Sequence, residues 1–132
     1  MTAEEYIGTL SENEQHIINQ FRKVILENDK EVFENFGKLM SNPHAFCYNE
    51  QGVFKYGLTV AKNHLSFHSL VMYSNPGLMD GLKTQLKNAR FQKGCINFKS
   101  LDDFPLSVFE KHMQVSSKVD FSPIIKHYQH RK

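Results

Sequence analysis

The chain has 132 residues, of which 40% are hydrophobic and 23% are charged, with a formal net charge of +2. A single domain of this length buries roughly two thirds of its unfolded surface, so it needs neither a disulfide nor a structural metal. The ordinary share of charged residues argues against disorder. No run of about 18 apolar residues is present to form a transmembrane helix. Because acids stand where a signal peptide carries basic residues, we expect a cytoplasmic protein with no membrane partner.

The charges are distributed unevenly along the chain. Residues 1–34 hold eight acids and three basic residues, a net charge of −5 that leaves +7 for the remainder. Two interpretations stay open: an acidic region and a basic region that form an interaction surface, or two solvated faces that complement each other. Nucleic-acid binding is not expected, because the excess of positive charge is small and scattered.

The N-terminal third begins with two capping boxes. Ser11 and Glu14 have the spacing of a capping box that opens a helix over 12–27. Thr2 and Glu5 form a second box, which predicts a short helical turn that Gly8 closes. The longer segment carries apolar residues at helical spacing, namely Ile17, Ile18, Phe21, Val24 and Ile25. It is therefore predicted to be an amphipathic helix.

Residues 29–44 have a mixed pattern. The apolar residues Val32, Phe33, Phe36, Leu39 and Met40 have helical spacing. Gly37 interrupts that spacing, and Asn42-Pro43 ends it. The segment is predicted to be a short helix or an irregular stretch.

The middle of the chain has the composition of β-strands. Residues 45–48, 53–61 and 65–73 are rich in Val, Phe, Tyr, Leu and Thr. Residues 49–52 supply turn chemistry, and Lys62-Asn63-His64 separates the last two strands. This order predicts three consecutive antiparallel strands with a central hairpin that turns at Lys62-Asn63-His64.

Helices return in the last third. Ser74-Asn75-Pro76 is a helix start, because Pro is well tolerated at the first helical position. It predicts a helix to about residue 88, followed by a short strand over 94–98. Asp103-Phe104-Pro105 predicts a further helix, and Ser122-Pro123 opens a last short helix or a basic tail over 119–132. The whole chain is predicted to be one α+β domain, with helices packed against an antiparallel sheet.

Four segments of this chain resemble the YdhG-like family, a bacterial domain-of-unknown-function family that includes a frataxin-like iron chaperone. They are Glu5-Tyr6-Ile7, Lys62 to Phe67, Lys93 to Phe98, and Phe104-Pro105-Leu106, and with their spacing they cover residues 4–118. Two stretches depart from the family pattern: residues 36–40 replace a Tyr-Gly-Met-Pro-like stretch, and Cys95 replaces a Thr. The resemblance implies an α+β fold and a frataxin-like role in binding or delivering iron.

Four residues are candidates for binding a ligand. Lys62 and His64 at the hairpin turn could bind an anionic group, or lie in a solvated turn. His64 and His68 lie four residues apart, about 13 Å along a strand, so one metal ion cannot bind both. Cys95 follows Lys93, whose charge could lower the pKa of the thiol. Both Cys47 and Cys95 are expected to be reduced, because neither lies in a ligand-spaced motif.

The acids after the first long helix are candidates for a metal site. Frataxin-type iron chaperones bind metal through exposed acids on an early helix, and oxygen ligands suit such weak binding. The densest group comprises Glu27, Asp29, Glu31 and Glu34, with Arg22, Lys23 and Lys30 between or near them. A solvated face is the alternative.

The sequence thus favours a binding domain over an enzyme. Iron is the one cofactor that the resemblance suggests, and no nucleotide-binding or hydrolase motif occurs. Two further hypotheses stay open. One is a small-molecule pocket, or an enzyme, that uses the sheet near His64 and Cys95. The other is a protein-interaction module that forms a homo-oligomer.

Overall fold

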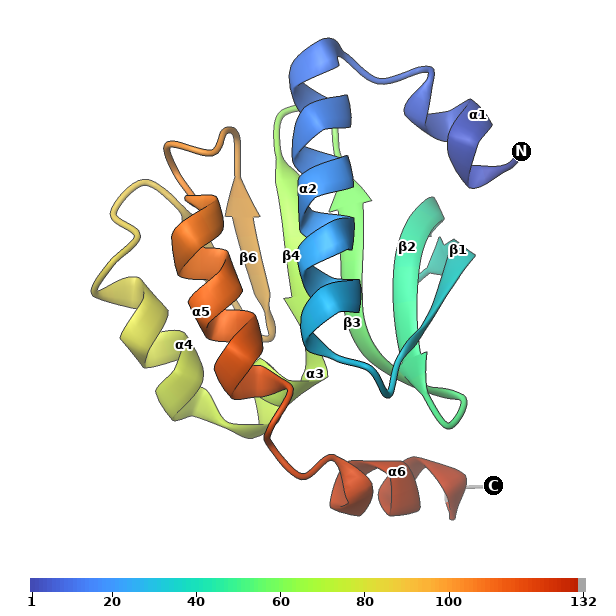
Figure 1. Cartoon of the computed structure of the whole chain (residues 1–132), viewed down its shortest axis with the longest axis vertical. Coiled ribbons are helices and arrows are strands. Elements are labelled where there is room, and N and C mark those ends of the chain that lie inside the picture. The colour runs from blue at the N-terminus through green and yellow to red at the C-terminus, as the bar shows by residue number, and fades with distance from the viewer. Residues whose placement is uncertain (131–132) are drawn as a thin grey trace.

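The computed structural model describes residues 1–130 and contains, within them, a six-stranded antiparallel sheet and six helices. The strands lie in the order β1-β2-β3-β4-β6-β5. Figure 1 shows helices α2 and α5 side by side in front of the sheet. This arrangement confirms the predicted α+β fold with helices packed against an antiparallel sheet.

Both predicted capping boxes are present. Helix α1 (Ala3–Ile7) begins at Thr2, and helix α2 (Glu12–Asn28) begins at Ser11. In each, the cap hydroxyl accepts a hydrogen bond from a backbone N–H, and a Glu side chain accepts one in return from the cap amide. These caps satisfy amides that would otherwise lack partners at the helix starts. The predicted α2 differs from the observed helix by one residue.

The prediction for residues 29–44 is wrong. Residues Phe33–Leu39 form strand β1, the edge strand beside β2 (Asn42–Glu50). The apolar residues at helical spacing do not share one buried side, because Phe33 and Met40 are exposed at 77% and 70%. Met40 adopts a positive φ of 53° in the turn between the strands. Pro43 lies inside β2 at an irregularity in the pairing, where a missing N–H is tolerated.

The central hairpin is confirmed, with one shortened strand. Strand β3 (Val53–Val60) pairs with β4 (Leu65–Ser69), and the Ala61 N–H donates to the His64 carbonyl at 2.8 Å across the loop. Residues 70–73, predicted as strand, belong instead to helix α3 (Leu70–Ser74). The Ser69 hydroxyl caps this helix by accepting the Met72 N–H. An apolar run of this length does not distinguish strand from helix by its periodicity.

The last third contains a strand that was not predicted. Helix α4 spans Pro76–Lys83 and ends five residues before the expected boundary. Strand β5 (Arg90–Gln92) then pairs with β6 (Cys95–Phe98) through a turn in which Gly94 has a φ of 69°. Helices α5 (Leu106–Ser116) and α6 (Ser122–Gln129) follow where helices were expected. Arg131 and Lys132 of the predicted basic tail lie outside the described residues.

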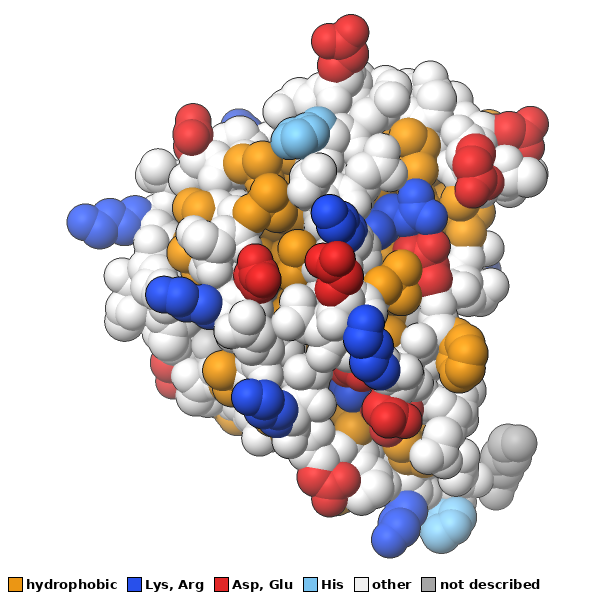
Figure 2. Space-filling model, viewed as in Figure 1, with side chains coloured by type: hydrophobic (Ala, Val, Ile, Leu, Met, Phe, Trp, Pro, Cys, Tyr) orange, Lys and Arg blue, Asp and Glu red, His pale blue; other side chains and the backbone are white. Residues whose placement is uncertain are grey.

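The aromatic core lies between the sheet and helices α2 and α5. Phe21 of α2 stacks on Phe109 of α5, with ring centroids 4.0 Å apart, and both side chains are fully buried. Phe67 of β4 and Phe98 of β6 pack against them from the sheet. On the outer surface of this side, acidic and basic side chains are interspersed (Figure 2). The sheet face under these helices is called the front face.

A buried ionic cluster joins the end of α2 to the β2–β3 hairpin. The Lys55 ammonium lies 2.8 Å from the Asp29 carboxylate and 2.7 Å from that of Glu50. Lys55 is only 1% exposed, and Asp29 also accepts a hydrogen bond from the Tyr56 hydroxyl. Because each buried charge has a close partner, the cluster avoids the large penalty of an unpaired ion in the interior.

Candidate functional site

The sheet face turned away from α2 and α5 is here called the back face, and its two central rows carry small and polar side chains. Residues directly opposite each other on neighbouring strands point to the same side of a sheet. One row crosses the whole sheet in the pairing register: Asn35, Cys47, Gly57, His68, Cys95 and Gln92. A second row contains Thr59, Ser66, Asn97 and Arg90.

Side-chain hydrogen bonds fix the part of this face that lies on β3, β4 and β6. The Ser66 hydroxyl donates to the Asn97 amide oxygen at 2.5 Å, and the Cys95 thiol contacts the same oxygen at 3.4 Å. His68 Nε2 lies 2.9 Å from the Thr59 hydroxyl. These bonds hold Asn97 and His68 in fixed positions on regular strands, which is the rigid support that a binding site needs.

A cavity of about 660 Å³ opens at the hairpin end of the back face, where β4 begins. We call it the hairpin pocket. Its volume lies in the range of small-molecule sites. It is lined by polar and charged residues from the hairpin loop, β5, β6 and the segments beside them: Asn63, His64, Asn88, Arg90, Gln92, Asn97, Phe98, Lys99 and Asp103.

The hairpin pocket has an excess of positive charge. Arg90 and Lys99 are cationic, whereas Asp103 is the one acid in the lining. The Asp103 carboxylate accepts a hydrogen bond from the Lys99 backbone N–H at 3.1 Å. Within residues 1–130, neither the Arg90 guanidinium nor the Lys99 ammonium forms an ion pair. The positive charges of these two side chains are therefore available to bind an anionic group.

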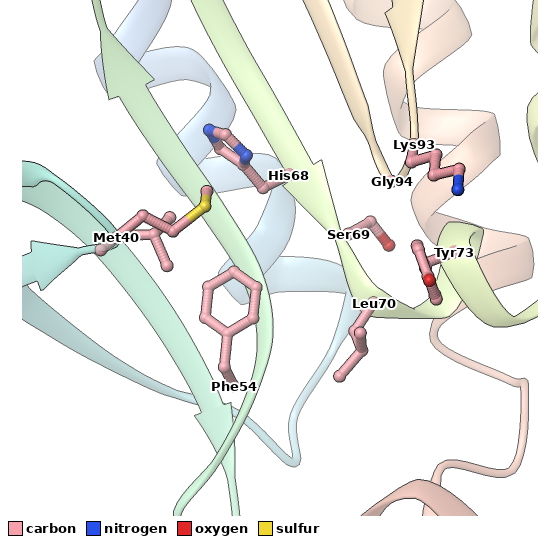
Figure 3. A pocket seen from close by; sticks show the side chains of 9 residues that line it. Met40, Phe54, His68, Ser69, Leu70, Tyr73, Lys93 and Gly94 are labelled. Atoms are coloured by element: carbon pink, nitrogen blue, oxygen red, sulfur yellow. The ribbon is translucent and has the colours of Figure 1, made fainter.

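A smaller cavity, here called the Met40 pocket, lies beyond the other end of β4 and has a volume of about 140 Å³. Figure 3 shows Met40 and Phe54 on one side of it, and Ser69, Tyr73 and Lys93 on the other. Two of its lining residues pack closely over Gly57, where a Cβ would lie 3.0 Å from both the Leu39 side chain and the Phe54 ring. Its volume lies below the usual range of small-molecule sites.

Burial shifts the pKa values of the histidine and the thiols on the back face. Burial, and then the nearby His64, lower the pKa of His68, so its imidazole is neutral at neutral pH. Burial raises the pKa of Cys95, contrary to the expected effect of Lys93, and it also raises the pKa of Cys47. Since thiols rather than thiolates are then present at neutral pH, neither cysteine is a ready nucleophile.

The two cysteines lie too far apart to form a disulfide. Cys47 is on β2 and Cys95 on β6, with β3 and β4 between them. Three strand spacings amount to about 14 Å, whereas bridged Cα atoms lie within about 7 Å. Both are free thiols.

The structure separates the four predicted ligand-binding residues. His64 lines the hairpin pocket, and Cys95 lies next to it through its contacts with Asn97 and Gln92. His68 lines the Met40 pocket instead. The Lys62 side chain is exposed in the turn and is not among the residues that line either cavity. His64 and Cys95 are therefore the two predicted residues that belong to one site.

The charged residues of the hairpin pocket were not predicted from the sequence. Arg90 and Gln92 lie on β5, a strand of three residues that is too short for a recognisable alternation. The signal that was available is Lys93-Gly94, a two-residue turn containing Gly that separates two short segments. Recognising a hairpin there would have placed Arg90 beside Asn97.

The four acids of the predicted metal site are not gathered. Asp29 is buried against Lys55, and Glu34 accepts hydrogen bonds from Arg22 and from the Tyr48 hydroxyl. Glu27 and Glu31 are exposed. Within residues 1–130, no group of three or more His, Cys, Asp or Glu residues is arranged to hold a metal ion. Iron binding remains a prediction from the resemblance alone.

None of the helices in residues 1–130 combines the length and the apolar composition needed to cross a bilayer. Comparison of the chain with protein-family models, with curated proteins and with solved structures finds no match. The YdhG-like resemblance therefore stays a prediction, and the hairpin pocket is the feature from which a function can be argued.

Proposed function

We propose that this chain is a binding domain that holds a small polar anion, carrying a carboxylate or a phosphate, in the hairpin pocket. The observation that supports this most is the pair of cations, Arg90 and Lys99, in a cavity of about 660 Å³ with one acid. An Arg guanidinium presents its donors in a planar fork that matches both kinds of anion, and a Lys adds a point charge.

The remaining lining suits the uncharged part of such a ligand. Asn63, Asn88, Gln92 and Asn97 each carry a carboxamide, which both donates and accepts hydrogen bonds. Arg90 lies directly opposite Asn97 in the β5–β6 pairing, so the cation and an amide are held side by side. A ligand with hydroxyl or amide groups around its anionic group fits this combination better than an apolar one.

The test is a nuclear magnetic resonance titration of ¹⁵N-labelled protein with inorganic phosphate and, separately, with citrate, at constant ionic strength. Saturable shifts of the amides of residues 63–64, 88–92 and 97–103 are expected. Replacing Arg90 by Gln removes a charged hydrogen-bond donor and should weaken binding roughly tenfold to a hundredfold.

The matched control is Lys23→Gln, which removes one positive charge from an exposed position on α2. It should leave the affinity within about twofold, because exposed charges beyond about 10 Å are screened at ordinary salt concentrations. Equal loss of affinity in both variants would mean that net charge, not the pocket, attracts the anion. No saturable shift with either anion would reject the proposal.

A further inference from the structure

The outer edge of β1 is an unpaired strand edge. β1 is the last strand of the sheet, and within the described part of the chain no strand lies on its other side. The irregularity in its pairing lies on β2: Gly37 opposes Ala45 and Leu39 opposes Asn42, so the extra residue belongs to β2. β1 itself is therefore regular, and its outer edge presents N–H and C=O groups that can pair with another strand.

We propose that a second copy of this chain pairs with this edge, β1 against β1 in antiparallel orientation, to form a two-fold symmetric dimer with a continuous twelve-stranded sheet built from two six-stranded ones. In an antiparallel pair, directly opposed residues form hydrogen-bonded and non-hydrogen-bonded pairs in alternation. A two-fold axis that maps one strand onto the other must pass through the middle of one such pair. One residue of β1 therefore faces the same residue of the second copy. The sequence of β1 selects that residue.

Phe36 is the residue about which β1 is self-complementary. With Phe36 opposite itself, Glu34, whose carboxylate also binds Arg22 of its own chain, faces Lys38 of the second copy, and Lys38 faces Glu34 of the second copy. Opposite charges directly across an antiparallel pair stabilise it, and like charges destabilise it. Registers centred on Asn35 or Gly37 instead place a charged residue opposite Phe36.

The same register covers the most exposed hydrophobic side chain of the molecule's described part. Phe33 is 77% exposed. With Phe36 on the two-fold axis, Phe33 lies opposite Leu39 of the second copy, on the back face. An exposed aromatic residue beside a free strand edge is what a pairing surface requires, and it is a hazard on an edge that stays unpaired.

Helices of opposite charge lie toward the two ends of β1. α1 lies toward the Leu39 end of β1 (Figure 1), where the Tyr6 ring stacks on His44 of β2 and contacts the Phe36 ring at a tilt. α6 lies toward the Phe33 end, where its last residues approach the β2–β3 turn (Figure 1). A two-fold axis through Phe36 exchanges these ends. It therefore places the end of β1 nearest the acidic first turn of α1, which holds Glu4 and Glu5, opposite the end nearest the basic last turn of α6, which holds Lys126 and His127.

The first test is sedimentation velocity of the full chain from micromolar to near-millimolar concentrations. The expected species is a dimer of twice the 15.4 kDa chain mass. Lys38→Glu converts two attractive pairs into two repulsive ones and should weaken the dimer by at least about tenfold. Lys111→Glu makes the same charge change at an exposed position on α5 and should leave the dimer intact. A chain that is monomeric throughout, or a dimer indifferent to Lys38→Glu, overturns the proposal.

The second test fixes the register by cross-linking. Directly opposed Cα atoms lie about 4.5–5.5 Å apart, within the range that a disulfide spans. Under oxidising conditions Phe36→Cys should therefore form a covalent dimer. In Gly37→Cys, whose neighbour on β2 is Ala45 and not a cysteine, the two new cysteines are out of register by two residues and lie about 8 Å apart, so cross-linking should be much slower. Equal rates in the two variants would contradict the proposed register.

Discussion

The two faces of this sheet are built from alternate residues of the same strands and have different properties. On the front face, Phe67 and Phe98 pack into an aromatic core with α2 and α5. On the back face, their neighbours Ser66 and Asn97 form a hydrogen bond beside a charged cavity. Stabilising packing is therefore concentrated on one side of each strand, and the other side carries the proposed binding site.

The largest expected effect is on the front face. Phe109→Ala removes a fully buried ring that contacts Phe21, Phe67 and Phe104. The free energy of unfolding should fall by about 3–5 kcal/mol, because the loss of packing and the cavity both count. Urea unfolding followed by circular dichroism measures it. A fall below about 1 kcal/mol would show that this face is not the main source of stability.

Removing one member of the buried ion cluster should lower the free energy of unfolding, because it leaves a buried charge unpaired. Lys55→Met leaves Asp29 and Glu50 without their counter-ion and should lower the unfolding free energy by about 3–5 kcal/mol. The double variant Lys55→Met, Asp29→Asn should recover part of that loss, because it removes the fully buried charge. If the double variant is no more stable than the single one, the unpaired carboxylate is not the cause.

Because His112 of α5 is buried, we expect the free energy of unfolding to depend on pH. Burial lowers the pKa of His112 to about 4, so the folded protein holds this imidazole neutral. Between an unfolded pKa near 6.5 and about 4, the unfolded chain binds more protons, and stability therefore falls as the pH falls through this range. The free energy of unfolding should fall by about 3 kcal/mol between pH 6.5 and pH 4.

His112→Gln removes that titration and should flatten the profile of unfolding free energy between pH 6.5 and pH 4. Glu34 acts in the same direction: although burial opposes it, hydrogen bonds from Arg22 and Tyr48 lower the pKa of its carboxyl, so its contribution is lost in acid. A profile unchanged by His112→Gln would assign the acid sensitivity to Glu34 or to other carboxylates.

The smallest expected effect is on the back face. Cys95→Ser replaces a thiol that donates to the amide oxygens of Gln92 and Asn97 by a hydroxyl that can donate to them as well, and it should change the unfolding free energy by less than about 1 kcal/mol. The raised pKa of Cys95 also predicts slow reaction with a thiol reagent at neutral pH. A loss comparable to that of Phe109→Ala would mean that the two faces contribute equally to stability.

Local signals in the sequence were enough to predict most of the fold. The capping boxes at Thr2 and Ser11 and the turn at Lys62-Asn63-His64 each depend on neighbouring residues, and the structure confirms them. Strand β1 depends instead on pairing with β2, which outweighs the helical spacing of its apolar residues. The end of β4 was missed because a Ser cap, not a change of composition, converts it into helix α3.

Less of the candidate site than of the fold could be predicted from the sequence. His64 and Cys95 were identified, but the cations of the hairpin pocket were not, because Arg90 and Lys99 lie on either side of a hairpin whose first strand has three residues. The acids from Glu27 to Glu34 were grouped by their proximity in the chain. The structure disperses them, since the chain leaves α2 and enters β1 between Asp29 and Glu34.

The most direct test of this division between the faces is urea unfolding with and without inorganic phosphate at constant ionic strength. A ligand that binds only the folded state raises the unfolding free energy. The original chain should therefore gain stability with phosphate, whereas Arg90→Gln should have nearly the same stability without phosphate and gain much less with it. Equal gains in both proteins would reflect the general stabilising effect of phosphate. That result would contradict a binding site at Arg90.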